Sequence, residues 1–130
     1  MNSTVIIGDL LLSRLEHMHR EDFIHRDLKP ANILTGLERT QNSIYLVDFG
    51  LSKKYRDKFT KMHIMYREGK SLTGTPRYAS INNHNGIEQS CRDDLESLFY
   101  VLVHLFRGKL PWMGMMKNRK MSSYEWYKTI

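Results

Sequence analysis

The chain has 130 residues, of which 41% are hydrophobic, so it is long enough for one globular domain with a sizeable core. Its formal net charge of +6 favours acidic partners, but it carries no nucleic-acid-binding pattern, and we expect no nucleic-acid partner. The single cysteine excludes an internal disulfide and no apolar run reaches the roughly 18 residues of a membrane span, so we expect a cytoplasmic or nuclear protein without a membrane partner.

The first predicted element is a helix that is capped by Asn2, Ser3 or Thr4 and runs to about residue 19. Four apolar residues recur at helical spacing and predict a buried stripe: Ile7, Leu11, Leu15 and Met18. Near the end of this helix, His17 and His19 are interpreted as exposed polar side chains and not as a metal-ligand pair.

A loop follows at 23–34, written FIHRDLKPANIL. Five of its residues match the pattern H-R-D-x-K-x-x-N of protein kinase catalytic loops: His25, Arg26, Asp27, Lys29 and Asn32. Phosphoryl transfer needs an acceptor for the hydroxyl proton of the substrate, a cation against the migrating phosphate, and oxygen ligands for magnesium. Asp27, Lys29 and the carbonyl oxygen of Asn32 can supply these in turn.

Two short strands are predicted on either side of a polar turn, at 33–34 and 44–47. The second strand leads into Asp48-Phe49-Gly50, a D-F-G motif that begins 21 residues after Asp27. A hairpin of this kind would bring Asn32 and Asp48 together as a magnesium site. Because two motifs occur in the expected order and context, chance coincidence is negligible, and the sequence indicates a protein kinase.

The stretch 50–75 lacks periodicity and is basic, with Lys53, Lys54, Arg56, Lys58, Lys61, Arg67 and Lys70 outnumbering its acidic residues. One interpretation is an activation segment whose cations receive phosphorylated or acidic substrate. The alternatives are a solvated loop and a nuclear-import patch at KKYRDK. All stay open, because loops of this length are usually functional or disordered.

The strongest predicted helix opens at Asp93 or Asp94 and ends at Gly108, which suits a left-handed C-cap. Its apolar residues lie nearly all round the helix, so we expect it to be buried on every side. A last amphipathic helix is predicted over 122–130.

Four longer stretches carry a more specific likeness: GTPRYASINNHNGIEQSCRDDLESL (74–98), DFGLSKKYRD (48–57), HIMYREGKSLTGT (63–75) and RGKLPW (107–112). Together they resemble the casein kinase 1 family of serine/threonine protein kinases. The most specific element is Ser80-Ile81-Asn82, which stands where most kinases have A-P-E. The chain departs from the family at Phe99, where a glycine is usual, and we expect this bulk to need accommodation in a tightly packed helix.

The resemblance implies ATP and Mg²⁺ as cofactors. Asp27 would be the catalytic base and Lys29 the lysine that contacts phosphate. Thr75 would hydrogen-bond both of them and shape the site of the substrate hydroxyl, while Asp94 would hold the backbone of the catalytic loop.

The metal ligands implied by the resemblance are Asn32 and Asp48. These two residues, with Lys29, would make up the cofactor-binding set.

Two anion sites are also implied, for protein substrates with acidic or phosphorylated segments. The first comprises Arg26, Lys53 and Lys70. The second uses Arg77, the backbone at Gly114 and a lysine that this chain replaces by serine. The alternative for both sets of cations is a solvated face.

The implied fold is the C-terminal lobe of the protein-kinase-like α+β fold, mainly α with a short β-hairpin. Residues 1–130 would form a partial kinase domain, with the catalytic loop at 23–34, the D-F-G motif and activation segment at 48–82, and the central helix at about 93–107. We expect no N-terminal lobe within these residues.

The sequence is compatible with three functions. The first is ATP-dependent phosphorylation of protein serine or threonine, with a preference for acidic or phosphate-primed substrates. The second is a catalytically inactive lobe that binds acidic or phosphorylated segments. The third is a truncated product without a function.

Overall fold

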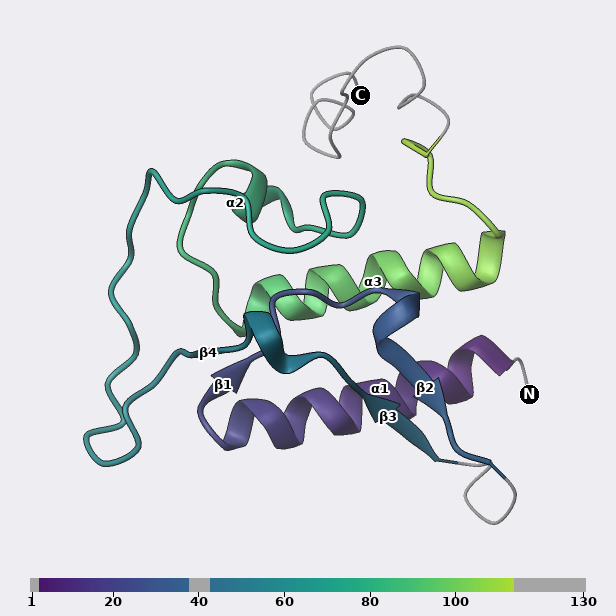
Figure 1. The fold of residues 1–130 in the computed structure, drawn as a ribbon, viewed down its shortest axis with the longest axis horizontal. Helices are drawn as coiled ribbons and strands as arrows, with labels where there is room; N and C mark the ends of the chain where they lie inside the picture. The colour runs from purple at the N-terminus through teal and green to yellow at the C-terminus, as the bar shows by residue number, and fades with distance from the viewer. Residues whose placement is uncertain (1–2, 38–42, 114–130) are drawn as a thin grey trace.

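A computed structural model describes residues 3–37 and 43–113, and Figure 1 shows how their elements are arranged. The helices are α1 (Ser3–Arg20), α2 (Ile81–His84) and α3 (Cys91–Arg107). The strands are β1 (Phe23–Ile24), β2 (Ile33–Thr35), β3 (Ile44–Leu46) and β4 (Lys53–Lys54), with 3₁₀ turns η1 (Pro30–Asn32) and η3 (Phe49–Leu51). The described part therefore combines three helices with two small antiparallel sheets, as expected of a partial α+β kinase fold.

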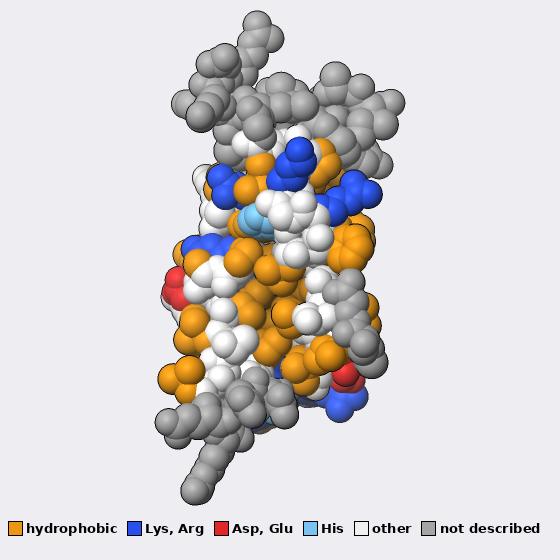
Figure 2. Space-filling view, turned by 90° about the vertical axis from the view of Figure 1, so that its right-hand side faces the viewer, with side chains coloured by type: hydrophobic (Ala, Val, Ile, Leu, Met, Phe, Trp, Pro, Cys, Tyr) orange, Lys and Arg blue, Asp and Glu red, His pale blue; other side chains and the backbone are white. Residues whose placement is uncertain are grey.

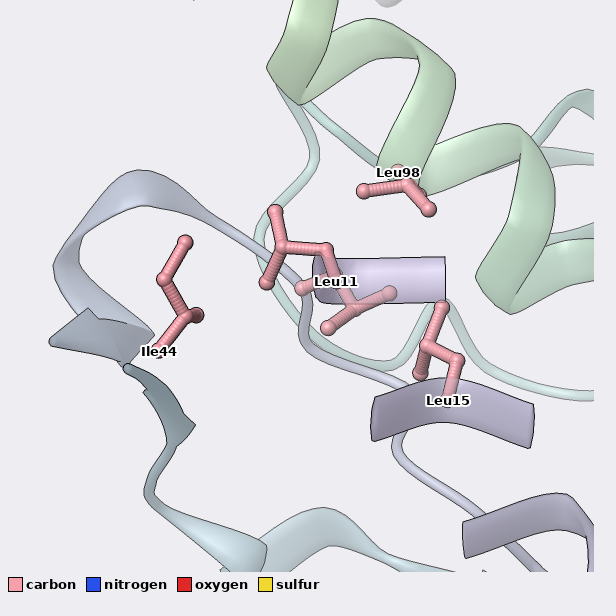
Figure 3. Packing of buried hydrophobic residues seen from close by; sticks show 5 residues of the cluster. Leu11, Leu15, Ile44 and Leu98 are labelled. Carbon is pink, nitrogen blue, oxygen red and sulfur yellow. The ribbon is translucent and has the colours of Figure 1, made fainter. Parts of the chain in front are cut away.

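Helix α1 confirms the first predicted element and supplies much of the core. Leu11 and Leu15 are both 1% exposed and pack in a cluster with Ile44 of β3 and Leu98 of α3 (Figure 3). The two long helices also approach closely at Gly8, where an added Cβ would lie 3.3 Å from Leu102 Cδ1. The small residue therefore serves the α1–α3 contact.

Helix α3 ends as predicted, with Gly108 as a left-handed C-cap at a φ of 74°. Its predicted start was wrong, because the N-cap is Ser90. Asp93 is the third helical residue of a capping box, and its Oδ2 accepts a hydrogen bond from Ser90 N at 2.7 Å. The same carboxylate accepts a bond from Ser80 Oγ, the N-cap of α2, at 2.5 Å.

The expectation that α3 is buried on every side was wrong for the part of the chain that the structure describes. Its buried apolar residues are Leu98 and Val101, whereas Leu95 and Phe106 are exposed. Phe99 is 62% exposed, so its bulk lies at the surface and needs no space in the core. The helix is amphipathic.

Hydrophobic side chains also gather across the centre of the face where α1 begins and α3 ends, as Figure 2 shows. Exposed apolar residues at these two helix ends are Val5, Ile6, Leu105 and Phe106. The apolar surface of the two helices thus exceeds what their mutual contact buries.

The two sheets bring the sequence motifs together. Strands β2 and β3 form the predicted hairpin, with Leu34 opposite Tyr45. Strands β1 and β4 form a pairing that the sequence did not predict, with Ile24 opposite Lys53, so the basic segment starts beside the catalytic loop.

The predicted helix at 122–130 lies outside the described residues. No helix in the described ranges combines the length and apolar character that a membrane span requires.

Candidate active site

Asp94, in the first turn of α3, holds the backbone of the catalytic loop. Asp94 is 1% exposed, and its Oδ2 and Oδ1 accept hydrogen bonds from the backbone nitrogens of His25 at 2.8 Å and Arg26 at 2.9 Å. Arg26 has a φ of 68°, a left-handed conformation that costs free energy in a residue with a side chain. The two bonds to a buried carboxylate hold this strained turn in place.

The carboxylate of Asp27 is the most heavily bonded group in the loop. Its Oδ1 accepts hydrogen bonds from Thr75 Oγ1 at 2.7 Å and from Thr75 N at 2.8 Å, and Lys29 Nζ lies 2.7 Å from Oδ2. Burial alone would raise the pKa of Asp27, but the bonds from Lys29 and Thr75 outweigh burial and leave this pKa below its ordinary value. Asp27 is therefore ionised at neutral pH, as a proton acceptor must be.

Gly74 is the reason that Thr75 can reach Asp27. Its φ is +88°, and a Cβ built on it would lie 2.4 Å from the carbonyl oxygen of Arg26. The backbone of the segment before Thr75 thus runs directly against the catalytic loop, at a distance that only glycine allows.

Asn32 and Asp48 offer oxygen atoms to a cation. Asn32 Nδ2 donates to the carbonyl oxygen of Asp27 at 2.9 Å, so the amide is oriented by its nitrogen and its own side-chain oxygen remains for a ligand. Val47 N donates to Asn32 O at 3.0 Å, which brings the start of the D-F-G motif next to Asn32. Asp48 is exposed and has a φ of 64°.

This donor set fits magnesium. Mg²⁺ prefers oxygen ligands and is usually held in proteins by one or two carboxylates together with waters and substrate phosphates. No group of three or more His, Cys, Asp or Glu side chains in 3–37 and 43–113 is suited to hold a metal, so a protein-only cage is not found there.

Two of the three cations of the first predicted anion site form ion pairs with Glu88. Lys53 Nζ lies 2.8 Å from Glu88 Oε1, and Lys70 Nζ lies 3.5 Å from Oε2. Arg26 donates through Nε to Leu51 O at 2.6 Å. Burial lowers the pKa of Arg26, and the negative charges of Glu88 and Asp94 act in the opposite direction. We name these three cations the cation cluster.

The sequence model of the protein kinase domain matches residues 5–128. The chain belongs to the protein kinase domain family. Kinase domains of this family transfer phosphate to proteins, and the family generally uses ATP and Mg²⁺. The catalytic loop, the D-F-G motif and the cation cluster all lie within the matched range.

One residue of the kinase domain that the sequence interpretation placed wrongly is His19. Its Nε2 lies 2.8 Å from Asp94 Oδ2, and its side chain is 13% exposed, so it is not an exposed polar side chain. His17, in contrast, is exposed as expected. Its spacing could have indicated this burial, since His19 follows Leu15 by one helical turn and so lies on the same face of the helix.

The second predicted anion site of the kinase domain is only partly described. Arg77 is half-buried, and its carbonyl oxygen accepts a hydrogen bond from Trp112 Nε1 at 2.9 Å. Gly114 and the serine that replaces the family's lysine lie outside the described residues.

Proposed function

We propose that the chain is the C-terminal lobe of a casein kinase 1-like serine/threonine kinase and takes part in ATP-dependent phosphorylation of proteins. The observation that carries this proposal is the pair of hydrogen bonds from Thr75 to Asp27, which joins the activation segment to the expected base. The Ser80-Ile81-Asn82 sequence at the start of α2 supports the narrower likeness.

In this proposal Asp27 accepts the proton of the substrate hydroxyl. Lys29, which is bonded to Asp27, places a positive charge where negative charge develops on the transferred group. Asn32 and Asp48 would hold Mg²⁺, which supplies positive charge against the phosphates when it is bound. Thr75 fixes the orientation of the carboxylate, so that proton acceptance needs no rearrangement.

The preference for acidic or phosphate-primed substrates is supported by the cation cluster. Arg26, Lys53 and Lys70 come from three separate segments. Lys53 and Lys70 both form ion pairs with Glu88, and the charge of Glu88 also acts on Arg26. Arginine and lysine are the side chains that bind phosphate and carboxylate most strongly. Lys70 is exposed and Lys53 is partly exposed, so an acidic segment can reach both.

The test is transfer of radiolabelled phosphate from ATP to casein by the chain and by its Asp27→Asn variant. We expect transfer that falls by about a hundredfold or more in the variant, because a positioned general base contributes on that order. Asp9→Asn, an exposed position on α1, is the matched control and should keep full activity. A signal no higher than that of Asp27→Asn would refute phosphate transfer, and binding of a phosphoserine peptide without transfer would favour the binding lobe.

A further inference from the structure

The cation cluster already contains an anion. Glu88 is 8% exposed, and both of its carboxylate oxygens face lysine ammonium groups. Its backbone is fixed as well, since Glu88 N donates to Arg67 O at 2.8 Å. The cation cluster, which is suited to bind acidic substrate, thus includes the buried carboxylate of Glu88.

The charge on Glu88 is maintained by its neighbours. Burial alone would raise the pKa of Glu88, but the bond from Lys53 and the nearby Lys70 outweigh burial and leave this pKa below its ordinary value. At neutral pH the group is therefore ionised and cancels one of the three positive charges of the cluster. Charge interactions of this kind are weakly screened when one partner is buried.

Glu88 also uses a lysine donor that an incoming anion would need. Each lysine ammonium group has three N–H donors, and the hydrogen bond to Glu88 occupies one on Lys53, while Lys70 faces Glu88 as an ion pair at 3.5 Å. The side chains of these lysines are 33% and 44% exposed, so their remaining donors can face solvent. An anion therefore meets a cluster that is open but already partly neutralised.

We propose that Glu88 is a resident counterion that weakens anion binding by the cation cluster and so determines how tightly a primed substrate is held. The inference rests on the proposed preference for acidic or phosphate-primed substrates and goes beyond it. Its effect is largest for doubly charged ligands, because a phosphoserine carries about −1.5 to −2 charges at neutral pH and a carboxylate carries one. A weakened hold favours release of a phosphorylated product.

The test compares the full chain with its Glu88→Gln variant in calorimetric binding of a phosphoserine peptide, and of the same peptide with glutamate at that position. Glutamine keeps the shape and removes the charge. We expect the variant to bind the phosphoserine peptide about tenfold more tightly, with a smaller gain for the glutamate peptide. Glu68→Gln is the matched control, since it removes one exposed negative charge from the same segment and should change little.

Two outcomes would overturn the inference. If the unsubstituted chain binds the peptide and Glu88→Gln binds it equally or less tightly, Glu88 is not a competing counterion, and the proposed function stands. If neither chain binds, the cation cluster is not an anion site, and the proposed substrate preference fails as well.

A second measurement covers the case in which Glu88→Gln does not fold. Coupling between two charges is reciprocal, so bound sulfate must raise the pKa of Glu88 if Glu88 weakens sulfate binding. The carboxyl carbon of Glu88 is titrated by NMR in the unsubstituted chain, with and without saturating sodium sulfate. A pKa that stays the same or falls in sulfate would contradict the proposal.

Discussion

Replacing Asp94 by alanine should lower the free energy of unfolding by about 3–5 kcal/mol, because it leaves the buried backbone N–H of His25 and the partly buried N–H of Arg26 without an acceptor. His19 loses its partner in the same change. Urea denaturation followed by circular dichroism measures this loss. The strained turn at Arg26 should relax as well, so the catalytic loop would lose its shape even where the protein stays folded.

Asp9→Ala provides the control for that experiment, because Asp9 is exposed and such substitutions usually change stability by less than about 0.5 kcal/mol. Asp94→Asn should lower the free energy of unfolding by an intermediate amount, since the amide keeps one oxygen acceptor and the shape of the side chain. A loss below about 1 kcal/mol in Asp94→Ala would show that the catalytic loop holds its conformation without this carboxylate.

Gly74→Ala is expected to destabilise the protein by about 3 kcal/mol and to separate Thr75 from Asp27. Part of this cost, about 1–2 kcal/mol, comes from the left-handed backbone. The remainder comes from the contact with Arg26 O, which is backbone and cannot turn aside. Phosphate transfer to casein should fall together with stability, because the hydrogen bonds that orient Asp27 depend on this close approach.

The matched control is Gly69→Ala. Gly69 also has a positive φ, +72°, but a Cβ there meets nothing within 4 Å, so the substitution carries only the backbone cost. Thermal unfolding of both variants separates the two contributions. Equal losses of stability in the two variants would mean that the segment before Thr75 moves away from the catalytic loop without cost, which would contradict a close backbone contact between Gly74 and Arg26.

The elements that local pattern determines were predicted well. The stripe containing Leu11 and Leu15 gave α1, the polar turn between two apolar runs gave the hairpin, and Gly108 gave the end of α3. The start of α3 was missed although Ser90 and Asp93 have capping-box spacing. The acidic pair was interpreted as the cap itself.

The features that depend on distant parts of the chain could not be predicted. Strands β1 and β4 have two residues each, too few to show any periodicity. The burial of α3 was overestimated because an apolar composition does not say which neighbours a helix has.

In the candidate site, too, residues within one local pattern could be predicted and contacts between distant residues could not. Asp27, Lys29 and Asn32 could be proposed as site residues because phosphoryl transfer fixes residue types at fixed spacings within one loop. The contact of Asp94 with that loop was expected only from the family resemblance. Glu88 was missed altogether, since its partner Lys53 lies 35 positions away and no local pattern marks a carboxylate that will be buried between lysines.

The carboxylate of Asp93 links the start of α2 to the start of α3. Its Oδ2 accepts a hydrogen bond from Ser90 N, the N-cap of α3. Its Oδ1 accepts one from the hydroxyl of Ser80, and this hydroxyl in turn accepts a hydrogen bond from Asn83 N in α2. The first turns of both helices should therefore open together as one cooperative unit in native-state hydrogen exchange. Ser80→Ala should speed exchange at the amides of Asn83 and Ser90 alike, so that the end of the activation segment and the start of α3 share one local unfolding free energy.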